Sequence, residues 1–333
     1  MRATVDSQIT SQQSLVRSSE SNLTRPPSED QRAAHGPVTA LLRRLRVSQP
    51  LNFLATSTVR AILRAAGSHS EMVIKHLHRV GAVSDRLPNG RTLRLWSRAD
   101  DWVSNQVYWR GWRGYEPETA PLFFRLASRA RVTLDVGAYV GFFTLIAGHA
   151  NPNGRVFGFE PLPDAYKRLQ SNVELNKLTN VVAVASAVGE VDGRADFFCA
   201  DTHMPCSSSL SYEFMQSADS LRSFQVPVVK LDTFVRENGL QGVDLMKIDT
   251  ESTEPQVLNG MIETMRRDQP LIFCEVLKER GSEELLQEII RSINYRAYLL
   301  TPEGPELRDR IEGHPEWLNY LFTALSPSEV AEL

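Results

Sequence analysis

The stretch that decides the fold joins an apolar strand to a helix and reads Leu134-Asp135-Val136-Gly137-Ala138-Tyr139-Val140-Gly141-Phe142-Phe143. Gly137 permits a sharp turn and the close approach of a ligand, and Gly141 lets the next helix lie near the strand. Ligands of open α/β sheets bind outside the carboxyl ends of the strands, which is where this turn falls. Asp135 places a carboxylate that can receive an ammonium group, whereas a phosphate-binding loop offers bare amides there. The turn therefore predicts a ligand that carries an amino acid group.

A second acid follows at the end of the next predicted strand, in the sequence Gly158-Phe159-Glu160-Pro161. An acidic residue at this place can accept both hydroxyls of a ribose. Pro161 has no N–H to donate and ends the strand. A third strand, which ends near Ser186 and Ala187, would flank an adenine ring. The set favours a nucleoside site over the competing interpretation, a glycine-containing turn followed by an ordinary surface acid.

Strands and helices alternate on the C-terminal side of this turn. Strands are predicted at 132–136, 155–159, 181–188, 243–248, 271–276, 295–300 and 319–325, with a polar excursion before a strand at 225–229. Helices are predicted at 142–149, 163–176, 254–266 and 282–293. Near-continuous apolar strands that alternate with helices indicate an α/β fold: a doubly wound, mostly parallel sheet with helices on both faces. The sequence is thus predicted to contain a Rossmann-like domain at 115–333.

The N-terminal third has a different composition. Residues 1–36 are rich in Ser, Gln, Thr, Arg and Pro, which predicts a disordered tail. Residues 37–114 are predicted to form a helical and hairpin extension. Apolar faces around Leu42 and around Leu54 indicate two helices, and the turn signal Pro88-Asn89-Gly90 separates two alternating strands.

Charge is unevenly distributed along the chain. Residues 1–100 hold 15 Lys and Arg against 7 Asp and Glu, while the rest holds 22 against 33. The basic helices could contact a membrane surface or another subunit, or could simply be a solvated face. No nucleic-acid partner is expected, because no separate RNA-binding module is visible. Three unpaired cysteines and the absence of an apolar run of membrane-spanning length favour the cytoplasm.

These features resemble the FkbM family of S-adenosylmethionine-dependent methyltransferases. The resemblance runs from about Tyr115 to Val276, and besides the two segments above it rests on residues 115–119, 172–176, 231–234 and 244–251. It implies the class I methyltransferase fold, with seven strands of which the last is antiparallel. It also implies S-adenosylmethionine as cofactor, S-adenosylhomocysteine as product, and a small-molecule acceptor hydroxyl on a sugar, glycan or polyketide. The residues then expected at the cofactor are Glu116, Asp135, Gly137, Ala138, Tyr139, Gly141, Glu160, Pro161, Ser186 and Ala187.

The sequence departs from the family pattern at two positions. The family usually has Asn at the position of Tyr139, where a left-handed backbone is convenient, and Gly at the position of Ser252. Tyrosine could adopt that conformation only at some cost, or the turn could differ. Serine removes backbone freedom close to the expected methyl-transfer centre.

Carboxylates near the ends of the later strands are the candidates for chemistry. Asp249 is the first choice for the base or acceptor anchor, and Glu251 and Glu275 are the others. The competing interpretation is that Asp249 caps the helix that begins near Glu254. Alternatives for the whole protein are a Mg²⁺-dependent O-methyltransferase, an RNA methyltransferase and a non-catalytic nucleoside-binding protein. A metal site is not expected, since no third oxygen ligand accompanies Asp249 and Glu275.

Two further segments carry chemistry-bearing side chains. Trp109, Trp112 and Tyr115 could form an aromatic wall for a sugar ring or a core between domains, and neither interpretation is preferred. His203 and Cys206 lie in a polar loop that could cover the site.

Overall fold

The computed structural model describes residues 48–67, 70–200, 208–211, 215, 221–278 and 280–333. The predicted tail at 1–36, the predicted helix around Leu42 and the loop with His203 and Cys206 lie outside the described residues. None of the helices in the described part of the chain is long and apolar enough to cross a membrane.

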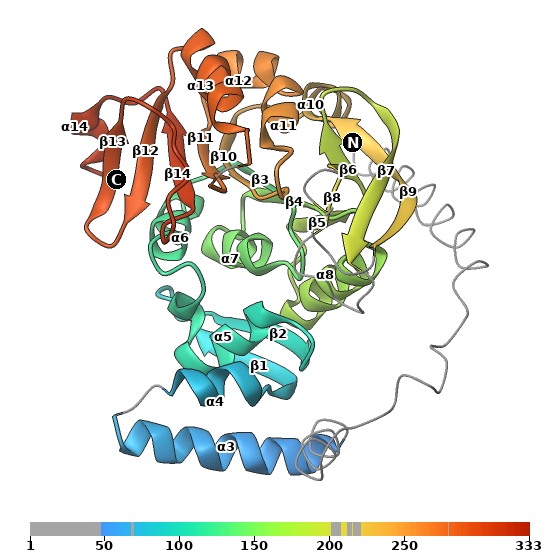
Figure 1. The fold of residues 1–333 in the computed structure, drawn as a ribbon, viewed down its shortest axis with the longest axis vertical. Coiled ribbons are helices and arrows are strands. Elements are labelled where there is room, and N and C mark those ends of the chain that lie inside the picture. Colours follow the sequence, from blue (N-terminus) through green and yellow to red (C-terminus); the bar gives the residue numbers. More distant parts are fainter. Residues whose placement is uncertain (1–47, 68–69, 201–207, 212–214, 216–220, 279) are drawn as a thin grey trace.

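The main sheet confirms the predicted doubly wound α/β fold (Figure 1). Its strands run in the spatial order β13-β12-β14-β11-β10-β3-β4-β5. Strands β5, β4, β3, β10 and β11 are parallel, and β14 is antiparallel to both of its neighbours. The bounds are β3 Val132–Val136, β4 Arg155–Phe159, β5 Val181–Val184, β10 Val243–Ile248, β11 Leu271–Glu275, β12 Arg296–Thr301, β13 Gly304–Arg308 and β14 Asn319–Thr323.

Seven of these strands are the expected ones, and the last of them is antiparallel as the resemblance implies. The additional strand β13 pairs with β12 as a hairpin at the edge of the sheet. None of its five residues is buried, so it lacks the alternation of buried and exposed side chains from which strands are recognised in a sequence.

Helices cover both faces of the sheet, because each face buries its own hydrophobic cluster. One cluster includes side chains of α6 Ala120–Ala127 and α7 Phe142–Ala150. The other lies beneath α10 Leu231–Glu237, α11 Glu254–Asn259, α12 Ile262–Asp268 and α13 Glu283–Ser292. Helices α8 Pro163–Asn176 and α14 Pro327–Val330 complete this part of the chain (Figure 1).

Two predicted elements are divided in the structure. The helix predicted at 254–266 is wrong as one element: it breaks at Gly260, and the Asp232 carboxylate accepts hydrogen bonds from the N–H groups of Glu263 and Thr264. These bonds satisfy amides that begin a new helix, α12. The strand predicted at 181–188 is also wrong as one element, because the chain leaves the main sheet after Val184.

A second sheet begins where the first is left. Strands β6 Ala187–Gly189, β7 Gly193–Ala200, β8 Ser208–Ser209 and β9 Leu221–Lys230 form it in the order β6-β9-β7-β8. The predicted strand at 225–229 is the second half of β9, whereas β7 lies in the segment predicted to be a polar excursion. Ser186 fixes the crossing point, since its hydroxyl donates to the carbonyls of Ala187 and Pro227.

The N-terminal extension contains the predicted helix and hairpin. Its elements are α3 Gln49–Ala65, α4 Glu71–His76, β1 Val80–Arg86, β2 Thr92–Arg98, α5 Trp102–Arg110 and η3 Trp112–Gly114. The motif asparagines of α8 hold the hairpin in place: the backbone N–H groups of Trp96 and Arg94 donate to Asn172 at 2.7 Å and to Asn176 at 2.9 Å.

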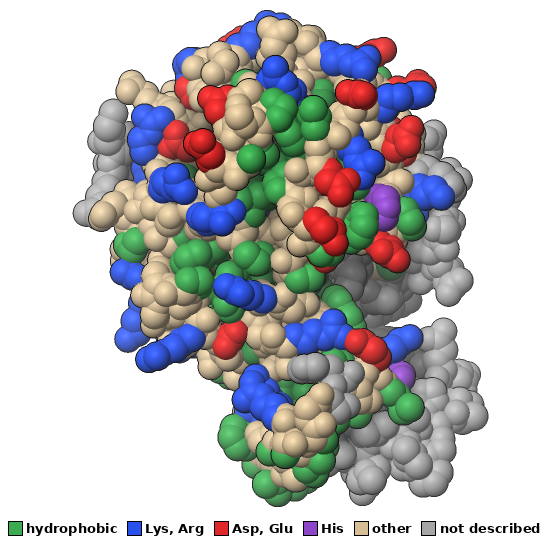
Figure 2. All heavy atoms as spheres, turned by 90° about the vertical axis from the view of Figure 1, so that its left-hand side faces the viewer, with side chains coloured by type: hydrophobic (Ala, Val, Ile, Leu, Met, Phe, Trp, Pro, Cys, Tyr) green, Lys and Arg blue, Asp and Glu red, His purple; other side chains and the backbone are tan. Residues whose placement is uncertain are grey.

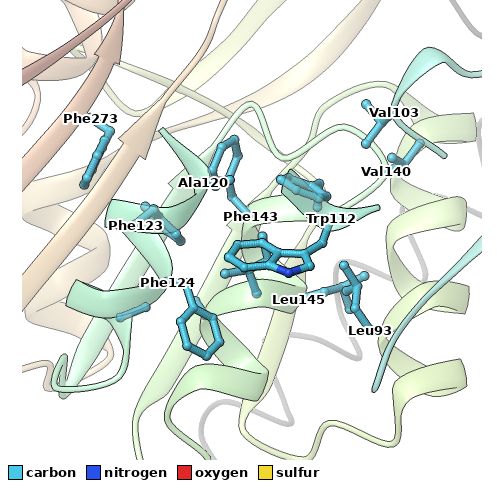
Figure 3. Close-up of a cluster of buried hydrophobic side chains, with 14 of the residues drawn as sticks. Leu93, Val103, Trp112, Ala120, Phe123, Phe124, Val140, Phe143, Leu145 and Phe273 are labelled. Atoms are coloured by element: carbon cyan, nitrogen blue, oxygen red, sulfur yellow. The ribbon is translucent and has the colours of Figure 1, made fainter. Parts of the chain in front are cut away.

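The extension shares a hydrophobic core with the rest of the protein. Leu93 and Trp112 lie in one cluster with Phe124 and Leu145, and the Trp112 and Phe124 rings are 5.7 Å apart (Figure 3). The boundary predicted at residue 115 is therefore crossed by a continuous core, and the division into domains stays a prediction.

Candidate functional site

A cavity of about 250 Å³ opens at the carboxyl ends of β3, β4 and β10, where the sequence predicts the ligand. Nine of the thirteen predicted site residues line it: Gly137, Tyr139, Glu160, Pro161, Ser186, Ala187, Asp249, Glu251 and Glu275. Four predicted residues are not among its lining: Glu116, Asp135, Ala138 and Gly141. The cavity also contains residues that sequence reasoning missed, which include Trp102, Phe197, Ser208, Leu210, Thr250 and Thr253.

The first turn places two strand ends in direct contact. Gly137 has a φ of 80°, and a Cβ built on it would lie 1.7 Å from the carbonyl oxygen of Asp249. The Asp249 amide in turn donates to the Val136 carbonyl at 3.0 Å. Glycine is thus required at this position because the backbone of Asp249 leaves no room for a side chain, whether or not a ligand also approaches the turn. This contact sets the position of Asp249 relative to the turn.

Glu160 is held by the same turn. The Tyr139 amide donates to its Oε2 at 2.7 Å, and the Leu162 amide donates to its Oε1 at 2.8 Å. Tyr139 has a φ of 50°, so this tyrosine does adopt the left-handed conformation for which the family favours Asn. Glu160 is 4% exposed. Burial raises the pKa of Glu160 to about 7, although both amides favour the charged form. The site therefore presents an oriented carboxyl group with spare acceptor capacity.

Asp135 was expected to receive the ammonium group of the ligand, but it is not among the residues that line the cavity. Its carboxylate accepts a hydrogen bond from the Thr144 hydroxyl of α7 and lies behind the cavity. Burial raises the pKa of Asp135 to about 6 against the effect of that hydrogen bond. Gly141 also acts behind the cavity: it begins α7 with a φ of 92°, and a Cβ there would meet Leu169 at 2.4 Å.

Lys247 is the centre of the charged part of the site and is not among the site residues predicted from the sequence. Its side chain is 1% exposed, and its Nζ lies 3.4 Å from Oδ2 of Asp249 and 3.8 Å from Oε2 of Glu116. Burial opposes the ammonium form, but the surrounding carboxylates, Asp249 first, raise the pKa of Lys247. A lysine in the middle of the apolar strand β10 was the available signal, because a buried cation needs a carboxylate partner.

Glu116 belongs to this charged cluster. Its Oε2 accepts a hydrogen bond from the Asn319 side chain at 2.9 Å, which ties it to β14. Burial raises the pKa of Glu116 to about 7, while Lys247 acts in the opposite direction. Its place is therefore beside Lys247, and it is not among the residues that line the cavity.

The two strand-end carboxyl groups of the cavity have contrasting surroundings. Asp249 faces the Lys247 ammonium group. Burial, followed by the charges of Asp249 and Glu251, raises the pKa of Glu275 well above its ordinary value. These neighbouring charges disfavour a further negative charge at this edge of the sheet, so they favour the protonated form of Glu275. Among the described residues, no group of three or more His, Cys, Asp or Glu side chains is arranged to hold a metal ion.

The loop after Asp249 is organised by Glu254. Its Oε1 accepts hydrogen bonds from the amides of Thr250 and Ser252, both at 3.1 Å. Thr253 is the N-cap of α11, and it makes no side-chain cap bond. The interpretation of Asp249 as the helix cap is therefore wrong, because its carboxylate is directed to Lys247 and the loop amides are satisfied by Glu254.

Ser252 occupies a strained backbone position in this loop. Its φ is 82°, and its buried hydroxyl has no hydrogen-bond partner among the described residues. We expect Ser252→Gly to raise the free energy of unfolding by about 1 kcal/mol, because glycine adopts this conformation without strain. Denaturant unfolding measures the change, and Ser223→Gly in the exposed part of β9 is the control, with an expected loss of similar size. A destabilised Ser252→Gly protein would show that the serine makes a compensating interaction.

The aromatic residues divide between core and cavity. Trp109 and Trp112 are 6% and 5% exposed and belong to the core. Tyr115 lines the cavity and packs on Phe142 with ring centroids 5.2 Å apart. Trp102, from the first turn of α5, also lines the cavity and is 40% exposed. The N-terminal extension thus supplies an accessible indole to the site.

Comparison with known proteins agrees with this geometry. Residues 135–321, more than half of the chain, match the family described as the methyltransferase FkbM domain. The chain is 28% identical over 142 residues to Methyltransferase 1 of Beauveria bassiana, which covers 38% of this chain and 57% of that protein. It is 23% identical over 206 residues to the 31-O-demethyl-FK506 methyltransferase FkbM of Streptomyces tacrolimicus, which covers 55% and 78%. It is 27% identical over 146 residues to the 2-O-methyltransferase NoeI of Sinorhizobium fredii, which covers 41% and 59%.

Solved structures of methyltransferases are also similar. The FkbM methyltransferase from Methylobacillus flagellatus KT has a TM-score of 0.40 and 17% identity, over 58% of this chain and 43% of that one. The chain spans less than two thirds of the length of several of these relatives. With the fold, the cavity and the family match in agreement, the chain belongs to the FkbM family of methyltransferases.

Proposed function

We propose that this protein uses S-adenosylmethionine to methylate a hydroxyl group of a small molecule such as a sugar, glycan or polyketide. The proposal rests on one observation: a single cavity is lined both by Glu160, whose carboxyl group can accept the hydroxyls of a ribose, and by the strand-end carboxyl groups of Asp249 and Glu275. Two relatives, the 31-O-demethyl-FK506 methyltransferase and the 2-O-methyltransferase, have names that specify methylation at an oxygen atom, and these names support an oxygen acceptor.

The residues present fit a nucleoside cofactor. Glu160 offers two carboxylate oxygens for the ribose hydroxyls, and Pro161 and Ser186 to Val188 line the side of the cavity where an adenine ring would lie. Gly137 and the buried Asp135 shape the turn on which the amino acid end would rest. S-adenosylmethionine supplies, when bound, a methyl group on a positively charged sulfur.

Asp249 is the proposed base or acceptor anchor. In the transfer, the bond between the acceptor oxygen and the methyl carbon would form as the bond between that carbon and the cofactor sulfur breaks, which leaves S-adenosylhomocysteine, and the hydroxyl proton would pass to a carboxylate within reach. The Lys247 ammonium group lies 3.4 Å from Asp249 at the cavity wall, and Glu275, in its protonated form, can donate a hydrogen bond and hold the acceptor oxygen. Glu251 remains an alternative, since it lines the same cavity.

The acceptor side has an aromatic character. Trp102 and Tyr115 come from the extension and its junction, and Phe197 and Leu210 come from the second sheet and the segment after it. An accessible indole suits the apolar face of a sugar or polyketide ring, while the carboxyl groups suit its hydroxyls.

The cofactor proposal is tested by Glu160→Ala. We expect S-adenosylhomocysteine to bind roughly a hundredfold more weakly, because a charge-assisted pair of hydrogen bonds worth about 3 kcal/mol is removed. Isothermal titration calorimetry measures the affinity, with exposed Glu190→Ala as the matched control and Glu160→Gln as the variant that keeps the size of the side chain. NAD⁺ should show no saturable binding. Unchanged affinity in Glu160→Ala would rule out this placement of the cofactor.

A further inference from the structure

A second cavity lies in the N-terminal extension, away from the methyltransferase site. It has a volume of about 480 Å³ between α3 and the β1 strand of the hairpin. Figure 1 shows α3 beneath this hairpin, at the end of the molecule opposite α12 and α13. Three arginines line the cavity, Arg60 and Arg64 from α3 and Arg79 from the segment before β1, and its lining contains no Asp or Glu.

Arg79 is the buried wall of this cavity. It is 7% exposed, and its Nη1 donates to the Phe53 carbonyl at 3.2 Å and to the Thr56 hydroxyl at 3.0 Å. Its buried Nε has no hydrogen-bond partner among the described residues. A guanidinium group has five N–H donors and is always charged, so a buried arginine without a carboxylate is costly.

Arg60 has the same deficiency. Its guanidinium lies 4.5 Å above the Tyr108 ring, and Arg79 lies 5.5 Å from the same ring. In the part of the chain that is described, the buried Nε of Arg60 also has no partner. Burial, followed by the charge of Arg64, lowers the pKa of Arg60. Contact with one aromatic ring offsets only about 0.5–2 kcal/mol of this cost.

The neighbouring carboxylate does not neutralise the cluster. Asp85 is near enough to affect Arg60, but its Oδ2 accepts the Trp112 amide at 2.8 Å. No ion pair in the described residues includes Arg60, Arg64 or Arg79, whereas Arg168 elsewhere in the extension interface is paired with Asp100 at 3.0 Å. Three cations therefore line one cavity, and two of them, Arg60 and Arg79, have a buried Nε donor without a partner among the described residues.

We propose that this cavity binds a phosphate monoester dianion. A guanidinium group can donate two parallel hydrogen bonds to the oxygens of a phosphate group. Three arginines match the three terminal oxygens of a phosphate monoester better than they would match the two oxygens of a carboxylate ligand. The cavity is larger than one phosphate group, and Ala61, Ala82 and Val83 add apolar surface for the attached group. The phosphate can belong to a soluble metabolite or to a lipid headgroup, since both carry the same chemistry.

The helix that supplies two of the arginines also has an exposed apolar side. Leu51, Leu54 and Ile62 are 53%, 65% and 61% exposed, and Figure 2 shows hydrophobic side chains on the lower lobe where α3 lies. The polar residues Asn52 and Thr56 face the protein instead, and both are buried. Because these exposed apolar side chains lie on the same helix as two of the arginines, the experiment also tests a lipid headgroup as the origin of the phosphate.

The test uses full-length protein at pH 8, where the phosphate is doubly charged. Glycerol 3-phosphate is titrated by calorimetry as the soluble probe. Phosphatidylcholine vesicles with and without phosphatidic acid, which has the same phosphate chemistry, are the lipid probe in co-sedimentation. We expect saturable binding of at least one probe, and at least a tenfold loss in Arg60→Gln/Arg64→Gln. Arg129→Gln, an exposed arginine of the methyltransferase domain, should leave the binding unchanged.

A second variant keeps the test independent of folding. Ala61→Glu places a carboxylate in the cavity, so it should abolish binding of the probe and raise the melting temperature. Binding of glycerol 3-phosphate places a soluble ligand in the site, and binding of phosphatidic acid vesicles alone places a lipid headgroup there. The proposal is overturned if neither probe binds saturably, or if the double arginine variant and Ala61→Glu both bind as wild type does.

Discussion

Turnover of Asp249→Asn is expected to fall by about two to four orders of magnitude, with S-adenosylhomocysteine affinity close to that of the wild type. The substitution keeps the size of the side chain and the backbone contact with Gly137, but it removes the carboxylate that takes the proton or anchors the acceptor. Lys247, 3.4 Å away, loses one of its counter-charges, so the variant should also be somewhat less stable.

The measurement is single-turnover methyl transfer with an acceptor found by screening hydroxylated sugars and polyketides. Asp244→Asn is the matched control, because it makes the same change at the opposite end of β10 from Asp249, where Asp244 pairs with Arg131. Glu275→Gln and Glu251→Gln are assayed in parallel. Retained turnover in Asp249→Asn with a large loss in one of these would transfer the role to that residue.

Metal dependence is separated in the same assay. If the reaction needs no metal, added chelator should leave the turnover unchanged. Loss of activity with chelator, and its recovery with Mg²⁺, would instead support metal-assisted activation of the acceptor hydroxyl.

Lys247→Met is expected to lower the free energy of unfolding by about 3–5 kcal/mol at pH 8. The variant leaves the partly buried carboxylates of Asp249 and Glu116 without the buried cation that lies between them. Breaking one partner of a buried ion pair costs far more than the pair itself contributes, because the remaining charge is uncompensated. Denaturant unfolding measures the loss, and exposed Lys75→Met is the matched control with an expected change within about 0.5 kcal/mol.

The pH dependence of this variant has a definite sign. The folded-state pKa of Glu116, already about 7, exceeds its ordinary value, so the folded protein binds a proton there more tightly than the unfolded chain does. Without Lys247 this pKa rises further. The loss should therefore be largest at pH 8 and smaller near pH 5.5, where the carboxyl group becomes protonated and neutral.

A double-variant cycle identifies the partner. Glu116→Gln should recover part of the loss when it is combined with Lys247→Met, because the stranded negative charge is removed as well. A stability of Lys247→Met that equals that of wild type across this pH range would contradict the view of Lys247 as the organising charge of the site.

Much of the fold could be predicted from local pattern. Apolar strands followed by amphipathic helices determine a parallel sheet with two covered faces, and parallel strands bring their carboxyl ends to one edge. Glu160, Asp249 and Glu275 were found in this way, since each stands at the end of a strand and needs no knowledge of distant residues to be placed there. The left-handed conformation at Tyr139 was suggested only by the resemblance to the family, which left a different turn open, and the structure shows a φ of 50° there.

The tertiary structure decided which of these side chains face the cavity and how their charges are balanced. Asp135 turns to Thr144 and Glu116 to Lys247, because their partners come from other elements of the fold. The chain leaves the main sheet after Val184, and its new course is held by Pro227, which is distant in sequence. The carbonyl oxygen of Pro227 accepts a hydrogen bond from the Ser186 hydroxyl. Trp102 lines the cavity because the N-terminal extension packs against the rest of the protein through a shared core. The sequence by itself determined the strand ends, since these follow from local periodicity, whereas burial and ion pairing depend on long-range packing and only the tertiary structure could assign them.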